Sequence, residues 1–408
     1  MVPVEEALEI VLREARALPV EEAALDDTLS RVLAEDVASD LDLPPFDRAA
    51  MDGYALRSRD VAGAPAALEI VGEVRAGQWP DLTVGPGQAA RIMTGAPLPP
   101  GADAVQPVEK TQPLDEFRVT VLSPVAEGSN VAPRGSEVRA GDVVLARGRV
   151  IDPAAIAVLA SAGRARVRVA RRPVVALLVT GDEIVAVSAT PAPGQIRNSN
   201  GPAVDAQARL AGATVRLLGV APDRQDAIAE ALGAGLAADV LVVSGGVSAG
   251  DYDLVEPALL QLGATFLFTK VAIKPGAPLV FGRRGETLVF GLPGNPVSAQ
   301  VTFDLFVRPA LLKMQGARVV ARPRVVVELL ADVRNRSGRK SHVPARVRFE
   351  GGRLVARPLR SRGSGDLVAH ARANALVVIE AARPQAAAGE TAEAVLLGRF
   401  LEDDGAPL

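Results

Sequence analysis

The stretch DVLVVSGGVSAGDYD (residues 239–253) decides the fold predicted for this chain of 408 residues. It contains a short apolar run, Leu241 to Val243, of the kind that forms a strand buried on both faces. The run ends at Ser244-Gly245-Gly246, where glycine lets the backbone turn tightly and approach a ligand. An apolar segment with helical spacing follows at 254–262. Strand, glycine turn and helix in this order are typical of anion and nucleotide sites in open α/β sheets.

Two carboxylates follow the glycines, Asp251 and Asp253, and they favour a divalent cation beside the bound anion. An ordinary tight connection with solvated acids explains the same residues. One glycine turn does not separate the two interpretations.

The chain around this stretch alternates between strand and helix patterns. VVALLVT at 174–180 is a continuous apolar strand that follows Arg171-Arg172-Pro173. Such alternation predicts a mostly parallel, doubly wound sheet with right-handed crossovers. The expected elements are a helix near 202–211, a strand at 214–220, a helix at 224–236, strands at 239–243 and 265–273 on either side of a helix at 254–262, and a long helix from Pro296 to about Met314.

The segments on either side have a different character. Apolar residues at helical spacing predict helices at 3–17, at Leu25 to Leu33 and at Ile151 to Ala162. Short strands separated by glycine and proline between 61 and 133 predict a small, mostly-β domain. After Gln315, five strand-like runs with turn residues between them predict a small barrel or sandwich.

Composition excludes several classes of protein. Domains of about 100–200 residues predict roughly two to four domains in this chain. A net charge of −3 argues against a general nucleic-acid binder, and the absence of cysteine excludes disulfides and thiolate chemistry. Only His342 and His370 are available as imidazoles, so acid–base or metal chemistry falls mainly to carboxylates and lysines. The acidic N-terminus and the lack of an apolar run near ~20 residues predict a cytoplasmic protein that binds no membrane.

Polar residues gather where the predicted strands end, and ligands of doubly wound sheets bind beyond the carboxyl ends of the strands. Carboxylates within ~6 Å of one another repel, so several on one rim favour a bound cation, and Mg²⁺ fits because water and phosphate oxygens complete its shell. Lysines four residues apart on one strand face the same side, where both can reach one polyanion. The rim residues are Thr180, Gly181, Asp182, Glu183, Asn198, Ser199, Asn200, Asp223, Ser244, Gly245, Gly246, Ser248, Asp251, Asp253, Lys270, Lys274, Pro293 and Pro296.

These motifs together resemble the molybdopterin molybdenumtransferase family (the MoeA type, which includes the E domain of gephyrin). The resemblance covers nearly the whole chain, and the order of the motifs is specific. The matching stretches are PPFDRAAMDGYALR (44–57), MTGAPLPPGADAV (93–105), PRGSEVRAGD (133–142), TGDE (180–183), GQIRNSN (194–200), GGVSAGDYD (245–253), KVAIKPGAPLVFG (270–282), GLPGNPVSA (291–299) and, more weakly, GSGDLVAHARAN (363–374).

The resemblance implies a homodimer whose protomers have four domains. Residues 1–39 and 134–166 would form an elongated two-segment domain, and 40–133 an inserted β-rich domain. Residues 167–316 would form the molybdopterin-binding doubly wound α/β domain, and 317–408 a C-terminal β-barrel. The family inserts molybdate into adenylylated molybdopterin with Mg²⁺ and releases AMP and molybdenum cofactor. Transient partners would be the molybdopterin adenylyltransferase and molybdoenzyme apoproteins.

The resemblance also implies roles for particular residues. Asp52 matches the acid of the family's MDGYA motif and Thr94 the threonine of its TGAP motif; both would act in trans, from the other protomer. Taken alone, Asp52-Gly53 equally fits a plain turn. Pro293 and Pro296 match prolines that shape the binding pocket. The expected catalytic set is Asp52, Thr94, Glu183, Asp223, Asp253, Lys270 and Lys274, with Mg²⁺ on Asp223, Asp253 and Glu183, and the lysines would neutralise molybdate or phosphate.

The chain departs from the family pattern in places. Glu137 stands where many members carry aspartate, and Pro344 stands near a position that is often arginine, where Arg339 or Arg346 would have to substitute. Val368 and Ala369 replace common serines. Two rival functions stay open: a molybdopterin adenylyltransferase, which shares the doubly wound domain, and a non-catalytic, gephyrin-like scaffold. The MDGYA motif, the extra β domain and the paired lysines favour molybdate insertion.

Overall fold

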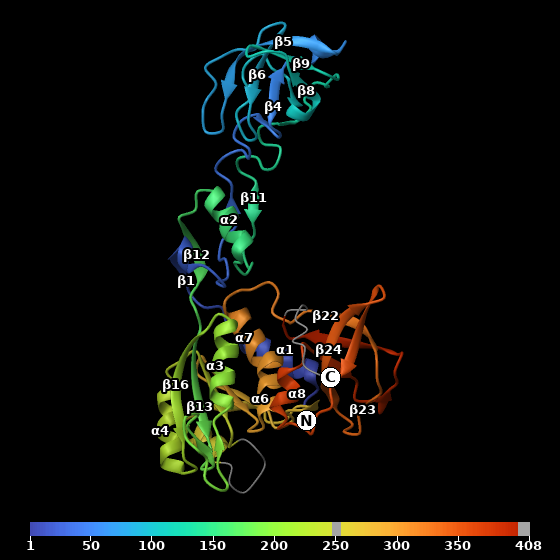
Figure 1. Ribbon diagram of the computed structural model, residues 1–408. Helices are drawn as coiled ribbons and strands as arrows, with labels where there is room; N and C mark the ends of the chain where they lie inside the picture. Colours follow the sequence, from blue (N-terminus) through green and yellow to red (C-terminus); the bar gives the residue numbers. More distant parts are fainter. Residues whose placement is uncertain (247–253, 399–408) are drawn as a thin grey trace. The chain divides into compact units, whose positions relative to one another are not determined.

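The computed structural model describes residues 1–246 and 254–398. The chain forms two compact units (Figure 1), and the domain boundaries predicted from the sequence stay predictions. The first unit comprises Met1–Ala34, Gly148–Asp152 and Arg168–Leu408, and the second comprises Glu35–Arg147 and Pro153–Val167.

The first unit is built on a six-stranded sheet of order β16-β13-β17-β21-β20-β18. The first four strands are parallel, and β20 and β18 complete the sheet as antiparallel strands. The doubly wound, mostly parallel sheet predicted from the sequence is therefore confirmed. Its strands are β13 (Val174–Thr180), β16 (Thr214–Ala221), β17 (Val240–Ser244), β18 (Thr265–Phe268), β20 (Val280–Arg284) and β21 (Thr287–Leu292).

Alternate residues of these strands enter two hydrophobic cores, because successive side chains of a strand point to opposite faces. Val240 and Val242 pack with α1, α3, α6 and α7, whereas Leu241 and Val243 pack with α4 and α5. Helices therefore cover both faces of the sheet (Figure 1). The helices are α1 (Val4–Glu14), α3 (Asn200–Leu210), α4 (Gln225–Gly235), α5 (Val255–Gln261), α6 (Pro296–Thr302) and α7 (Arg308–Met314), the last two joined by the π-helical segment η4 (Phe303–Val307).

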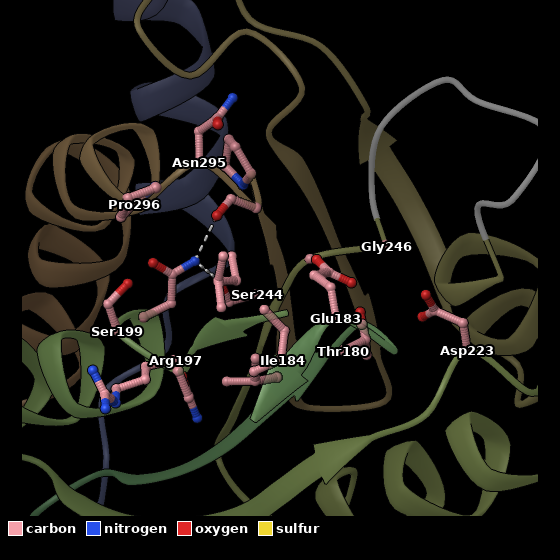
Figure 2. Close-up of a pocket in the computed structure, with 18 of the residues that line it drawn as sticks. Thr180, Glu183, Ile184, Arg197, Ser199, Asp223, Ser244, Gly246, Asn295 and Pro296 are labelled. Carbon is pink, nitrogen blue, oxygen red and sulfur yellow. Dashed lines mark hydrogen bonds between the residues drawn. The ribbon is translucent and has the colours of Figure 1, made fainter. Parts of the chain in front are cut away.

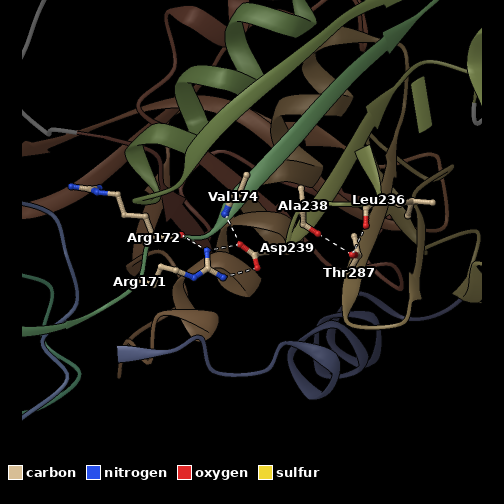
Figure 3. Close-up of polar contacts among 7 residues, drawn as sticks. All are labelled: Arg171, Arg172, Val174, Leu236, Ala238, Asp239 and Thr287. Atoms are coloured by element: carbon tan, nitrogen blue, oxygen red, sulfur yellow. Dashed lines mark hydrogen bonds and ion pairs between the residues drawn. The ribbon is translucent and has the colours of Figure 1, made fainter. Parts of the chain in front are cut away.

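A polar network holds the amino ends of β13 and β17 together (Figure 3). The Arg171 guanidinium donates to both carboxylate oxygens of Asp239, at 2.9 and 2.7 Å, and the Val174 backbone N–H donates to Asp239 at 2.7 Å. The Thr287 hydroxyl donates to the carbonyls of Leu236 and Ala238. Asp239 thus connects the strand that precedes the glycine turn to its neighbour.

Replacing Asp239 with alanine is expected to lower the free energy of unfolding by about 2 kcal/mol, since it removes three hydrogen bonds to a partly buried carboxylate. Asp226→Ala is the matched control, because Asp226 pairs with Arg224 at the surface and should cost less than about 0.5 kcal/mol. Urea unfolding followed by circular dichroism measures both. Equal losses in the two variants would show that the Asp239 network does not stabilise the sheet.

The C-terminal part forms a closed five-stranded barrel of order β24-β25-β22-β28-β26, because β26 also pairs with β24. This confirms the predicted barrel. β19 (Ile273–Lys274) adds to its edge beside β24. The barrel strands are β22 (Arg324–Leu329), β24 (Lys340–Glu350), β25 (Arg353–Pro358), β26 (Ala375–Ile379) and β28 (Thr391–Leu396), with the minor pair β23 (Val333–Arg334) and β27 (Gln385–Ala386) and the short helix α8 (Leu367–Ala371).

The second unit holds a six-stranded sheet of order β7-β4-β6-β5-β9-β8, which confirms the mostly-β character predicted for 61–133. Its elements are β2 (Val37–Ala38), β3 (Arg48–Ala49), β4 (Gly53–Leu56), η2 (Ser58–Val61), β5 (Ala66–Val74), β6 (Gln88–Ile92), β7 (Ala104–Pro107), η3 (Val108–Lys110), β8 (Thr111–Pro113), β9 (Arg118–Val121), β10 (Val131–Ala132), β11 (Val143–Leu145) and α2 (Pro153–Ser161).

Two expected elements are wrong. The helix expected from Leu25 to Leu33 is only a single 3₁₀ turn, η1 (Leu25–Asp27), because Ser30 has φ +62° and Leu33 then bonds to Arg149. The strand expected at 265–273 ends at Phe268. Short strands β1 (Val20–Ala24) and β12 (Arg166–Ala170) pair with each other. Within 1–246 and 254–398, no helix is long and apolar enough to cross a bilayer.

Candidate functional site

A cavity of about 430 Å³ opens at the carboxyl ends of β13, β16, β17 and β21 (Figure 2), where ligands of doubly wound sheets bind. It brings together twelve of the residues predicted from the sequence. They are Thr180, Gly181, Glu183, Asn198, Ser199, Asn200, Asp223, Ser244, Gly245, Gly246, Pro293 and Pro296.

The turn after β17 requires glycine at both of its positions. Gly245 has φ +97°, and a Cβ there would lie 2.6 Å from the Thr180 carbonyl oxygen. Gly246 has φ +64°, and a Cβ there would lie 2.9 Å from the Thr180 hydroxyl. That hydroxyl is buried and has no hydrogen-bond partner among the residues that the structure describes. The turn thus brings bare backbone and an unsatisfied hydroxyl to the cavity, as a polar ligand requires.

Carboxylates gather at the Thr180 end of the cavity (Figure 2). Glu183 and Asp223 line it, and the adjacent Asp182 accepts a hydrogen bond from the Asp223 backbone N–H at 3.0 Å. Partial burial, followed by the negative charges of Asp182 and Glu183, raises the pKa of Asp223. Gly181 has φ +142°, and a Cβ there would lie 2.6 Å from a Glu183 carboxylate oxygen. The glycine therefore allows Glu183 to fold back over the strand end.

This donor set fits a magnesium ion. A cation would offset the partial burial and the neighbouring negative charges that raise the pKa of Asp223, and Mg²⁺ needs only one or two carboxylates when water and phosphate oxygens supply the rest. No group of three carboxylates or histidines positioned for a metal occurs in 1–246 and 254–398. The described residues that would hold the ion are Glu183 and Asp223. Ser248, Asp251 and Asp253, also predicted here, lie outside the described residues.

The opposite end of the cavity is formed by the loop 194–200 and by the start of α6. Asn198 accepts the Gly201 backbone N–H at 2.8 Å, and the Asn200 amide donates to the Ser244 hydroxyl and the Gly294 carbonyl, each at 2.8 Å. These bonds tie the loop to the glycine turn (Figure 2). Because α3 begins at Asn200, the positive end of its dipole lies at this end, where an anion is favoured.

A second cavity of about 580 Å³ adjoins the first and shares Pro278, Pro293 and Asn295 with it. It lies between the α/β part and the barrel of the first unit. Lys274 lines it together with Arg334 and Arg339, and no carboxylate does. Within the described part of the chain, none of these three cations forms an ion pair. A cluster of unpaired positive charges favours a bound anion.

The two predicted lysines do not share a strand. Lys274 is in β19, whereas Lys270 lies outside any strand and lines neither cavity. The expectation that their four-residue spacing places both on one face of one strand is therefore wrong. The role of Lys270 stays a prediction. Arg339 lies at the second cavity together with Pro344, while Arg346 does not.

Asp52 and Thr94 lie together in the second unit. The Thr94 backbone N–H and hydroxyl each donate to the same Asp52 carboxylate oxygen at 2.7 Å, and these bonds, the backbone one first, hold the pKa of Asp52 below its usual value. A Cβ at Gly53 would lie 2.0 Å from the Gln106 carbonyl oxygen, so β4 must begin with glycine for Asp52 to follow this path. The structure thus brings this pair together as a fixed, ionised carboxylate.

Sequence reasoning missed several lining residues. Arg197 is the only cation that lines the first cavity in the described chain, and Ile184 and Ile196 form part of its apolar wall. Ile184 pairs with Ile196 and Val185 with Arg197 in a two-stranded ribbon, β14 (Ile184–Val185) and β15 (Ile196–Arg197). The motif GQIRNSN contained Arg197, but its position in that ribbon gave no signal in the sequence.

Family models match three consecutive regions of the chain. The MoeA N-terminal region (domain I and II) matches residues 2–163, the probable molybdopterin binding domain matches 176–313, and the MoeA C-terminal region (domain IV) matches 326–397. Together they cover most of the sequence. The chain belongs to the MoeA family.

The chain is similar to individual MoeA proteins over nearly its full length. The chain is 36% identical over 410 residues to the molybdopterin molybdenumtransferase of Bacillus subtilis (strain 168), covering 97% of this chain and 94% of that protein. It is 34% identical over 400 residues to the enzyme of the same name from Staphylococcus aureus (strain Mu50 / ATCC 700699), covering 97% and 95%. A crystal structure of the molybdopterin biosynthesis moeA protein from Pyrococcus horikoshii OT3 has a TM-score of 0.82 at 32% identity and covers 97% and 100% of the two chains.

Proposed function

We propose that this MoeA-family chain is a molybdopterin molybdenumtransferase, which inserts molybdate into adenylylated molybdopterin and releases AMP and molybdenum cofactor. The observation that carries the proposal is the pair of adjoining cavities. One holds carboxylates and a glycine turn, the other holds unpaired cations, and both share Pro278, Pro293 and Asn295. Such a pair suits two substrates, a nucleotide-like polyanion with its metal and a small oxyanion.

The first cavity would bind the adenylylated pterin. The glycine turn at Gly245 and Gly246 lets its phosphates approach the backbone closely, the positive end of the α3 dipole favours their negative charge, and Arg197 adds a positive charge. Glu183 and Asp223, with Asp253, would hold Mg²⁺, which when bound polarises the phosphoanhydride. The residues that line the first cavity would hold the adenylylated pterin in a fixed position at the carboxyl ends of the strands.

The second cavity would hold molybdate. Lys274, Arg334 and Arg339 together supply enough positive charge for a dianion, and no lining carboxylate opposes it. The shared residues place this oxyanion next to the substrate of the first cavity. This arrangement supports a transfer in which the two substrates meet near Pro293 and Asn295.

The site is proposed to be shared in a homodimer, with Asp52 and Thr94 supplied by the other protomer. Exposed large apolar side chains on the second unit support an interface, because Met51 and Met93 are each 42% exposed and Trp79, which packs on Phe46, is 71% exposed. Met51 and Met93 are the chain neighbours of Asp52 and Thr94, and Thr94 fixes the Asp52 carboxylate in its ionised form.

Mixed dimers test the shared site. At a molybdate concentration well below the KM of the variants, Asp52→Ala and Lys274→Ala should each retain only about a few per cent of wild-type activity alone. Co-expressed, they should recover about a quarter of wild-type activity, because half of the dimers are mixed and each mixed dimer retains one complete site. The tagged single variants, purified separately, are the controls. If co-expression recovers no activity although mixed dimers form, the site is not shared.

The two rival functions predict different experimental results. A molybdopterin adenylyltransferase would adenylylate molybdopterin with Mg·ATP and no partner enzyme, whereas the proposed enzyme should not. A gephyrin-like scaffold would neither bind nor turn over the adenylylated pterin at any Mg²⁺ concentration. The proposed activity also predicts a cytoplasmic protein that meets the adenylyltransferase before the reaction and molybdoenzyme apoproteins after it.

A further inference from the structure

The second cavity has a buried histidine on its wall that none of the roles described so far uses. His342 is 2% exposed, and its Nδ1 has no hydrogen-bond partner among the described residues. A buried polar atom of this kind costs free energy unless a ligand satisfies it. His342 therefore stands out among the residues that line this cavity.

The strand register places the imidazole on the outer face of the barrel. His342 pairs with Val378 and Pro344 pairs with Leu376, and these two partners pack with the helices of the α/β part. The neighbouring Val343 belongs instead to the barrel interior. His342 thus shares a face with Pro344, which also lines the cavity.

The surroundings keep the ring uncharged. Burial, followed by the charges of Lys340 and Arg324, lowers the pKa of His342 to about 3, while the charge of Glu5 on α1 and a hydrogen bond with the Lys340 backbone oppose this shift. Lys340 is itself paired with Glu5 at 2.5 Å and with Glu380 at 2.8 Å. The cavity wall therefore combines three unpaired cations with one uncharged imidazole whose Nδ1 has no partner among the described residues.

We propose that His342 is a positioning residue whose uncharged ring donates an N–H hydrogen bond to an oxygen of the oxyanion held by Lys274, Arg334 and Arg339. Cations alone attract any small anion, because the attraction between charges has little directional preference. A hydrogen bond from a fixed ring requires an oxygen at one place, so it selects by shape. This inference rests on the proposed oxyanion substrate of the second cavity.

The test is titration calorimetry with sodium molybdate at pH 7 on the full-length protein. His342→Phe keeps the size of the ring and removes the hydrogen bond, so the Kd for molybdate should rise about 5- to 10-fold. His342→Asn returns an amide near the position of Nδ1 and should restore the Kd to within about 3-fold. His370→Phe is the control, because His370 also has a buried, unpartnered Nδ1 but does not line the cavity.

Thermal unfolding separates positioning from a merely structural role. Without molybdate, His342→Phe should unfold at the same or a higher temperature than the wild type, since it removes an unsatisfied buried atom. The rise in Tm that molybdate produces should be smaller in this variant. A lower Tm with an unchanged molybdate response would overturn the proposal.

A comparison with Lys274→Ala distinguishes the two ways of failing. If Lys274→Ala loses molybdate binding while His342→Phe retains the wild-type Kd, His342 has no positioning role. If both variants bind molybdate as the wild type does, the second cavity is not the oxyanion site, and that part of the proposed function fails as well. A wild-type affinity that rises about tenfold from pH 8 to pH 6, and does so only when His342 is present, would show a charged rather than a neutral ring.

Discussion

Replacing Lys274 with alanine should lower kcat/KM for molybdate by roughly 30- to 100-fold. The lysine is exposed at the second cavity and has no carboxylate partner in the described chain, so its charge is available to the substrate. A hydrogen bond to a charged group contributes about 1.5–3 kcal/mol, and each 1.4 kcal/mol corresponds to about a tenfold change. The loss should fall mainly on the KM for molybdate, with the KM for the adenylylated pterin nearly unchanged.

Lys270→Ala is the informative control for this experiment. The resemblance to the family gives both lysines a role, whereas only Lys274 of the two lines the first or the second cavity. If Lys270→Ala changes kcat/KM for molybdate by less than about 3-fold, the oxyanion is assigned to the second cavity. Equal losses in the two variants would contradict that assignment, because Lys270 lines neither cavity.

Replacing Gly245 with alanine should lower the free energy of unfolding by about 3 kcal/mol and abolish binding of the adenylylated pterin. The residue has φ +97°, and its new Cβ would lie 2.6 Å from the Thr180 carbonyl oxygen, which belongs to a buried strand that cannot move freely. Backbone strain and overpacking each cost about 1–3 kcal/mol. The glycine turn would have to shift away from the cavity.

Gly263→Ala is the matched control, since Gly263 also has a positive φ, +83°, but has open space where the Cβ would go. Gly263→Ala should lower the free energy of unfolding by only about 1 kcal/mol. Hydrogen exchange of peptides from β17 and β21, measured beside urea unfolding, reports the loss at the strand ends. If the two alanine variants are equally stable and both bind the pterin, then the close approach of Gly245 to Thr180 has no role in the site.

Much of this architecture could be predicted from the sequence because its signals are local. The apolar runs before Thr180 and Ser244 identify strands buried on both faces, and the polar residues that follow them meet at one sheet edge. That is why twelve predicted residues line one cavity. The predicted helix at Leu25–Leu33 was wrong because a positive φ at Ser30 and a bond from Leu33 to Arg149 overrode local spacing.

The second cavity could not be predicted in the same way. Lys274 lies in β19, which the sequence places between α/β strands β18 and β20, whereas Arg334, Arg339 and His342 come from the barrel part of the chain. The pairing of β19 with β24 brings them together. Periodicity describes one element at a time and does not state which surfaces meet. The spacing of Lys270 and Lys274 misled for the same reason, since the expected strand ended at Phe268.

The most direct test of the proposed function is AMP release from adenylylated molybdopterin by the purified wild-type protein with Mg²⁺, with and without molybdate. The two adjoining cavities predict that AMP appears in proportion to the pterin supplied, that molybdate accelerates its release, and that Lys274→Ala needs far more molybdate for the same rate. AMP release that does not respond to molybdate, or no release at any concentration of molybdate and Mg²⁺, would contradict the proposal.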